Sequence, residues 1–271
     1  MSAVELVQAG QLDEALQSLQ NEVRRSPAEA RHRVFLFQLL AVMGRWDRAL
    51  TQLNVAADLD PSTLTMAQAY REILQCEALR DQIFSGKRSP LIFGEPADWI
   101  AQVVEALRLE AAGDLAGAAA VRAEAFDQAP ATRGAINGEP FEWIADADSR
   151  LGPLLELIVN GRYYWVPFDR IRRITAEAPA DLRDTVWMPV SLTWSNGGEA
   201  VGFIPTRYPG TTASADGAML LARRTDWVDA GAGTFRGLGQ RMFATGDGDH
   251  ALLDLRSMEL DAAPPASEDA A

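Results

Sequence analysis

Two aspartates have the spacing that best fits chemistry in this chain. Asp146 and Asp148 stand two positions apart, and on an extended segment their carboxylates project to the same face. Such a pair can act as a general acid and base or can hold a metal ion. The alternative is that these carboxylates pair with arginines such as Arg150, Arg183 or Arg207 and organise the surrounding loops. We favour this structural interpretation, so we expect no catalytic or metal-binding residue here.

The other chemistry-bearing residues are few and isolated. His250 ends the segment 246–250, GDGDH, which lacks calcium-loop spacing and a nearby second histidine, so a solvated turn is expected. His32 lies among charged residues at the start of a helix, without a nucleophile motif. The glycine-rich segment 231–239 lacks the Gly-Lys-Ser/Thr ending of a phosphate-binding loop. Cys76 falls in an apolar helical stretch, where a buried, unreactive thiol is expected. The sequence therefore predicts neither an enzyme nor a cofactor site.

Composition and charge exclude further classes. The chain has 271 residues, with 38 acidic against 25 basic side chains and a net charge of −13. This charge disfavours binding to nucleic-acid phosphates and to anionic membranes. No run approaches the roughly 18 apolar residues of a membrane helix, and the start does not read as a secretory signal. One cysteine allows no internal disulfide. We expect a cytoplasmic protein of two domains.

A repeated unit occupies the first half. Residues 10–16, GQLDEAL, recur at 44–50 as GRWDRAL and at 113–119 as GDLAGAA, and a proline follows each glycine by 17 residues. The first two copies are 34 residues apart. This spacing resembles the tetratricopeptide repeat, a helix-turn-helix module. Glycine permits the tight turn between the helices, and proline ends the second helix.

Helical periodicity extends this pattern. The second helix of the first unit carries an apolar stripe that includes Leu12, Ala15 and Leu16, and that of the second unit carries the same stripe from Trp46 to Ala57. Residues 34–43 are apolar on nearly every side, which predicts a helix packed between neighbours. Further helices are expected over residues 65–84, 97–112 and 114–128. Because 85–90 and 94–96 interrupt the array, we predict an irregular α-solenoid, whose concave surface suits a peptide or a helix.

The second half has the period of β-strands. Three hairpins are predicted: residues 154–159 with 162–168 around Asn160-Gly161, 185–194 with 199–205, and 240–245 with 251–255. We therefore expect an α+β chain of two domains, with a tetratricopeptide-like solenoid followed by a compact, mainly antiparallel β-rich domain. The predicted limits are 1–130 for the solenoid, 131–140 for a linker, 141–260 for the β-rich domain and 261–271 for a disordered acidic tail.

An ordered series of motifs in this half resembles one family. They are DADSRLGP at 146–153, GRYYWVPF at 161–168, LRDTVWMP at 182–189, IPTRYPG at 204–210, ARRTDW at 222–227 and GQR at 239–241. Together they are similar to the ImpE/TagJ (SciE-type) proteins, which are encoded with bacterial type VI secretion systems. The N-terminal repeats also match that architecture, so the resemblance covers nearly the whole chain.

The resemblance implies a non-enzymatic, virulence-associated accessory protein. Members of the family bind a helical N-terminal segment of the small subunit of the contractile sheath and influence sheath assembly or recycling. The AAA+ ATPase that disassembles the sheath is a second candidate partner. A solenoid groove is a suitable receptor for an amphipathic helix. The alternatives are a general helical-repeat adaptor with another partner, or a metal-dependent hydrolase that uses Asp146 and Asp148.

Twelve residues are candidates for partner binding or for defining the fold. Most lie in the motifs of the resemblance, and the two from the helical half are large aromatic residues that either pack in the core or line the groove. They are Asp146, Asp148, Arg150, Tyr164, Trp165, Arg183, Asp184, Trp187, Arg207, Tyr208, Trp46 and Trp99.

Overall fold

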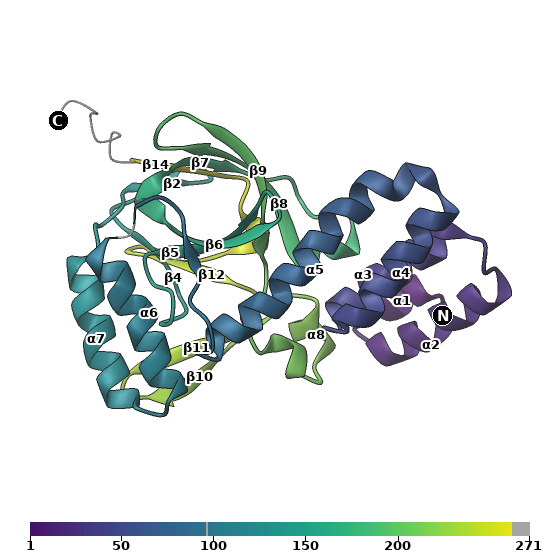
Figure 1. The fold of residues 1–271 in the computed structure, drawn as a ribbon, viewed down its shortest axis with the longest axis horizontal. Helices are drawn as coiled ribbons and strands as arrows, with labels where there is room; N and C mark the ends of the chain where they lie inside the picture. Colours follow the sequence, from purple (N-terminus) through teal and green to yellow (C-terminus); the bar gives the residue numbers. More distant parts are fainter. Residues whose placement is uncertain (96, 262–271) are drawn as a thin grey trace.

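The computed structural model describes residues 1–95 and 97–261 (Figure 1). Within them, seven α-helices come first and a mainly antiparallel sheet region follows. The predicted α+β class is therefore confirmed. The predicted acidic tail over 261–271 lies, apart from Asp261, outside the described residues.

The helices of the first half form helix-turn-helix pairs at the predicted places. Their bounds are α1 Ala3–Gln8, α2 Leu12–Arg25, α3 Ala30–Val42, α4 Trp46–Leu59, α5 Leu64–Phe84, α6 Asp98–Ala111 and α7 Leu115–Gln128. The turns α1–α2, α3–α4 and α6–α7 contain Gly10, Gly44 and Gly113, with φ angles of 75°, 67° and 89°. Because side chains with a Cβ rarely adopt this left-handed conformation, the glycines explain the turns.

Helix α5 separates two groups of helices. Helices α1–α4 lie at one end of the molecule, whereas α6 and α7 lie beside the sheet at the other end, and α5 runs between them (Figure 1). The third repeat copy is therefore apart from the first two. Residues Leu36–Val42 of α3 are all buried, as predicted for a helix packed between neighbours. No helix in the described ranges is both long and apolar enough to cross a membrane.

The main sheet has nine strands in the order β1-β6-β5-β9-β8-β7-β14-β2-β3. All of its pairings are antiparallel except that of β1 with β6. The strand bounds are β1 Leu91–Ile92, β2 Gly134–Ile136, β3 Glu139–Phe141, β5 Leu154–Val159, β6 Arg162–Pro167, β7 Ile171–Thr175, β8 Trp187–Trp194, β9 Glu199–Pro205 and β14 Ser257–Leu260.

Two smaller sheets and one short helix complete the fold. The first sheet has the order β13-β12-β4, and the second is the hairpin β10-β11. The bounds are β4 Ile144–Asp146, β10 Thr225–Gly231, β11 Thr234–Gly239, β12 Met242–Thr245, β13 Gly248–Ala251 and α8 Gly217–Leu220.

The predicted hairpins are present, with one shifted strand. Asn160 and Gly161, both at positive φ, join β5 to β6, as a type I′ turn requires. Strands β8 and β9 form the second hairpin. The predicted last strand, 251–255, is wrong: β13 begins at Gly248, because Thr245 already pairs with Gly248 across a tighter turn. Residues 252–254 then form a short 3-10 turn.

The predicted linker region contains two strands. Strands β2 and β3 pair with each other, and β2 also pairs with β14. Helix and sheet side chains share one hydrophobic cluster, in which Leu40 and Leu74 belong to helices and Trp165 and Trp187 to strands. The domain limits given above stay a prediction, but the two halves are packed together.

Candidate functional site

A buried network of charged side chains lies where α5 reaches the sheet. Arg80 of α5 donates to both carboxylate oxygens of Glu156 in β5, at 2.5 and 2.9 Å. Arg241, directly before β12, donates to Glu156 and to Asp146. All four side chains are buried. Since an unpaired charge in the interior is costly, these groups stabilise the fold only as a paired set.

The two aspartates singled out by their spacing are part of this interior. Asp148 accepts hydrogen bonds from the Arg150 Nε at 2.8 Å and from the Gly237 backbone N–H at 2.9 Å. Asp146 accepts from the Asp148 backbone N–H at 2.9 Å and pairs with Arg241. Among the described residues, no group of three or more His, Cys, Asp or Glu could hold a metal ion. The arrangement supports the structural interpretation of this pair.

Arg183 does not pair with these aspartates, so that suggested pairing is wrong. It pairs instead with Asp181, two positions before it, and its guanidinium lies 5.1 Å from the centre of the Tyr70 ring. Asp184 accepts hydrogen bonds from the backbone N–H groups of Ala180 and Asp181, at 2.9 and 2.8 Å. These contacts close residues 181–184 into a local turn.

Arg207 is also not a partner of the aspartates. Its guanidinium donates to the carbonyl oxygens of Val42 at 2.5 Å, Leu220 at 2.7 Å and Ala41 at 3.3 Å. It therefore binds the C-terminal ends of α3 and α8, where the helix dipole is negative. Burial lowers the pKa of Arg207 to about 10. This side chain fastens the helical end to the sheet region.

The aromatic candidates of the sheet extend the network. The Trp165 Nε1–H donates to the Tyr163 hydroxyl at 2.8 Å, and that hydroxyl donates to Glu156 at 2.5 Å. The Trp187 Nε1–H donates to Glu77 at 2.7 Å. Tyr208 bonds the backbone of β12 through its hydroxyl. These contacts bond the two tryptophans and Tyr208 to groups inside the fold.

The remaining aromatic candidates differ in exposure. Trp99 is buried in the core, and Tyr164 is half-buried with its ring edge-on to Phe93. Trp46 is half-buried, with its ring centre 5.7 Å from that of Trp187. Trp46 also lines an open pocket, which is described below.

The electrostatics of the network are uneven. Burial opposes ionisation of Glu156, but the Arg80 and Arg241 charges lower its pKa to about 2. Burial raises the pKa of Asp146 to about 7 against the attraction of Arg241. Burial and the Glu156 charge raise the pKa of Tyr163 well above its usual value. Glu156 is thus the firmly ionised centre, held between two guanidinium groups.

Five members of the network are not among the sequence candidates: Glu77, Arg80, Glu156, Tyr163 and Arg241. Tyr163 and Arg241 do lie within motifs of the resemblance, at 161–168 and 239–241. Glu156 can be recognised from the sequence, because a single charge in the apolar run 154–159, LLELIV, must be buried with a partner. Arg80 cannot be recognised in this way, since its partner Glu156 lies 76 positions further along the chain.

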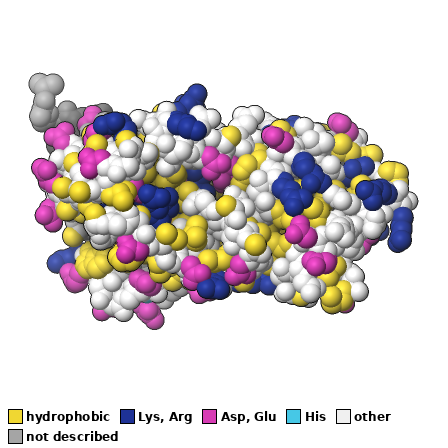
Figure 2. Space-filling view, turned by 90° about the horizontal axis from the view of Figure 1, so that it is seen from below, with side chains coloured by type: hydrophobic (Ala, Val, Ile, Leu, Met, Phe, Trp, Pro, Cys, Tyr) yellow, Lys and Arg dark blue, Asp and Glu magenta, His cyan; other side chains and the backbone are white. Residues whose placement is uncertain are grey.

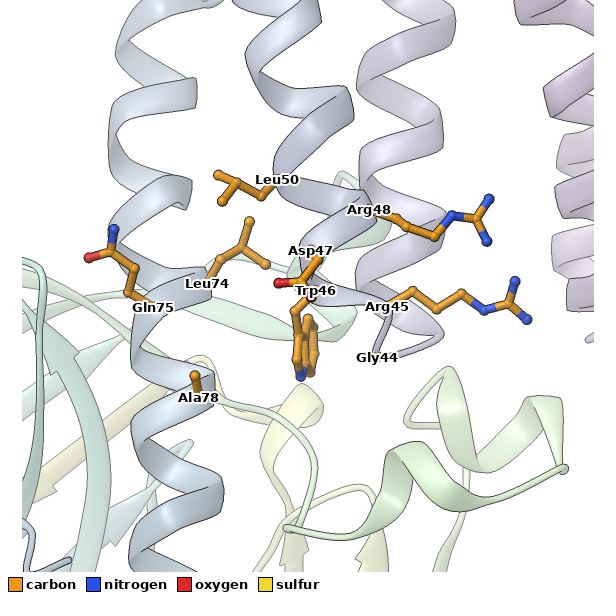
Figure 3. Close-up of a pocket in the computed structure, with 9 residues that line it drawn as sticks. All are labelled: Gly44, Arg45, Trp46, Asp47, Arg48, Leu50, Leu74, Gln75 and Ala78. Carbon is orange, nitrogen blue, oxygen red and sulfur yellow. The ribbon is translucent and has the colours of Figure 1, made fainter.

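An open pocket lies between α4 and α5 (Figure 3). Its volume is about 470 Å³, and its apolar lining comes from Trp46 and Leu50 on α4 and from Leu74 and Ala78 on α5. Figure 3 shows Leu50 and Leu74 pointing toward each other across the gap. The rest of the lining is Gly44, Arg45, Asp47, Arg48 and Gln75. An apolar hollow between two helices can receive side chains from another protein.

Comparisons with known proteins agree with the motif series. The family model described as ImpE protein matches residues 138–259. A relative from Pseudomonas aeruginosa strain PAO1, named "Type VI secretion system accessory component TagJ", is 51% identical over 261 residues, which cover 96% of this chain and 92% of the relative.

The fold is also found in a solved structure. The crystal structure of protein VPA1032 from Vibrio parahaemolyticus superposes with a TM-score of 0.87 at 25% identity, covering 96% of this chain and 98% of that one. The repeats, the motif order and the high identity over nearly the full length lead to one conclusion: this chain belongs to the ImpE/TagJ family.

Proposed function

We propose that this protein is an accessory component of a bacterial type VI secretion system and acts by binding other proteins in the cytoplasm. The observation that carries the proposal is the 51% identity, over 96% of the chain, to a relative named as such a component. A non-enzymatic role fits the buried network, because Asp146 and Asp148 are held by Arg241 and Arg150.

The partner in this proposal is the small subunit of the contractile sheath. Its helical N-terminal segment binds the helical half, and binding modulates assembly or recycling of the sheath. The apolar pocket between α4 and α5 supports this view, since amphipathic helices are recognised by apolar grooves. The sheath-disassembling ATPase is the second partner to test.

The test is a titration followed by fluorescence anisotropy. A labelled peptide with the N-terminal sequence of the sheath small subunit from the same organism is mixed with the purified protein, and a scrambled peptide is the control. Saturable binding of the native peptide alone supports the proposal. If neither this peptide nor the intact subunit binds, the proposed partner is wrong, and pull-down with the ATPase follows.

A further inference from the structure

The repeat register explains why the helical array stops after α5. Positions 34 residues apart occupy the same place in successive units: Leu6, Leu40 and Leu74; Val7, Ala41 and Gln75; Gly10, Gly44 and Ala78. In the first two units, the glycine adopts positive φ and the chain returns as α2 or α4. At the next 34-residue step, which we call the third unit and which differs from the third motif copy at 113–119, Ala78 stands in place of the glycine. Helix α5 therefore continues to Phe84.

The second helix of the third unit is therefore absent from its place beside α5. In the first two units the equivalent surface is covered, since Val7 is 7% exposed and Ala41 fully buried. In the third unit Gln75 and Ala78 are exposed. These residues and Leu74 form the α5 wall of the pocket in Figure 3, and the second helix of the preceding unit, α4, forms the other wall. The pocket thus lies where a helix would continue the repeat.

We propose that a helix from another protein occupies this position and completes the third repeat unit. The inference rests on the proposed function and names its binding surface. The helices that fill this position in the first two units show the required pattern, an apolar residue followed by alanine, leucine and leucine at +3, +4 and +7: Leu12, Ala15, Leu16 and Leu19 in α2, and Trp46, Ala49, Leu50 and Leu53 in α4. The small alanine allows close approach of two helices.

The charge around the pocket indicates which charged side chains flank the apolar stripe of the incoming helix. The lining carries Arg45 and Arg48 against Asp47, and Figure 3 shows both arginine side chains pointing away from α5, so their positive charge lies on the outer rim of the pocket on the α4 side. Figure 2 shows basic side chains gathered over the helical end of the face it presents. Opposite charges steer association and fix orientation, so the partner helix carries acidic residues beside its apolar stripe.

A small polar ligand fits this pocket less well than a helix. The arginines of its own lining, Arg45 and Arg48, point away from the gap (Figure 3). Glu77 and Arg80, which line a neighbouring pocket, are buried and already bonded to Trp187 and Glu156. Small-molecule sites need a few convergent polar groups that remain available to fix the ligand. Here the contacts that remain are mainly the half-buried apolar side chains of Trp46 and Leu50, whereas Leu74 is only 4% exposed.

The pocket is blocked most cleanly at Ala78. This residue is exposed within α5, and arginine is a good helix former, so Ala78→Arg fills the vacant position without disturbing the core. The matched control is Ala120→Arg, at an exposed alanine of α7 outside the pocket. Circular dichroism and thermal unfolding of both variants verify that the fold is retained.

Two labelled peptides serve as probes by fluorescence anisotropy. One has the N-terminal sequence of the sheath small subunit, and the other is a synthetic acidic helix with the stripe Leu-x-x-Ala-Leu-x-x-Leu. We expect wild type and Ala120→Arg to bind the sheath peptide alike, and Ala78→Arg to bind it at least tenfold more weakly.

The other outcomes separate the two proposals. Unchanged binding of the sheath peptide to Ala78→Arg overturns the pocket but keeps the proposed function. If only the synthetic helix binds, and Ala78→Arg abolishes that binding, the pocket stands and the sheath partner is wrong. If neither peptide binds the wild-type protein, or if only the synthetic helix binds and Ala78→Arg does not weaken it, the pocket proposal is wrong.

Discussion

At the scale of single residues, Glu156 is the anion that the two arginines of the buried network share. Two arginines and Tyr163 bond its carboxylate, and it is fully buried. Removing one partner of a buried charge pair leaves the other charge uncompensated. The contribution of such a network to the free energy of unfolding is therefore measured by changing one of its members.

Glu156→Gln is expected to lower the free energy of unfolding at pH 7 by about 3–5 kcal/mol, because Arg80 and Arg241 lose their common anion. Urea unfolding followed by circular dichroism measures the change. Glu14→Gln, at an exposed position of α2, is the control and should be neutral. A Glu156→Gln variant as stable as the control would mean that the network contributes nothing net.

The same residue predicts part of the acid sensitivity. The folded pKa of Glu156 is about 2, below its usual value of 4.5, so its contribution is fully present above pH 4.5 and is lost as the pH falls toward 2. By linkage this loss amounts to about 3 kcal/mol. Urea midpoints at several pH values should show the gap between wild type and Glu156→Gln closing below pH 4.5. A gap that is constant with pH would contradict the assignment.

Cys76 offers a test of burial that needs no variant. Burial raises the pKa of its thiol to about 12, and only the thiolate reacts with disulfide reagents. We expect no reaction with Ellman's reagent at pH 8 in the native protein and one thiol per chain in urea, since the sequence has one cysteine. Rapid reaction of the native protein would show that α5 opens from the sheet.

At the scale of elements, the glycine turns set the helix pairs. Gly44 and Gly113 both have positive φ, but a Cβ at Gly44 would lie 2.5 Å from a methyl carbon of Thr212, whereas nothing lies within 4 Å at Gly113. Gly113→Ala should cost about 1–2 kcal/mol from backbone conformation alone. Gly44→Ala should cost more. Thermal unfolding compares them, and equal losses would exclude a role for the Thr212 contact.

Elements were predictable from sequence where their cause is local. The helix α5 and the turn at Asn160-Gly161 follow from periodicity and turn chemistry, and both occur as expected. The sequence predicts a linker where β2 and β3 lie. Strand β2 is fixed by pairing with β14 about 120 positions later, and a local sequence pattern does not show such a pairing. Arg80 was missed for the same reason, since its carboxylate partner is distant in the chain. Local patterns do not contain such pairings.

At the scale of the whole molecule, Arg207 joins the two halves. Its guanidinium bonds carbonyls at the ends of α3 and α8, and its own backbone carbonyl accepts from Arg80 of α5 at 2.7 Å. Arg207→Met should leave buried carbonyls unpaired, at about 1–3 kcal/mol each. Hydrogen exchange should then become faster at the C-terminal end of α3 than in the strands. Arg48→Met, at an exposed position, is the control. Uniform change across the molecule would contradict a local fastening role.

The continuation of α5 past Ala78 also has a mechanical consequence. The pocket residues Leu74 and Ala78 lie in the C-terminal half of this helix, and Arg80, two positions after Ala78, is bonded to Glu156 of β5, which pairs with both β6 and β9. A helix resists stretching because its backbone hydrogen bonds lie along its axis. A pulling load on a partner held at the pocket would therefore pass along α5 and end on the Arg80–Glu156 pair rather than on a flexible hinge.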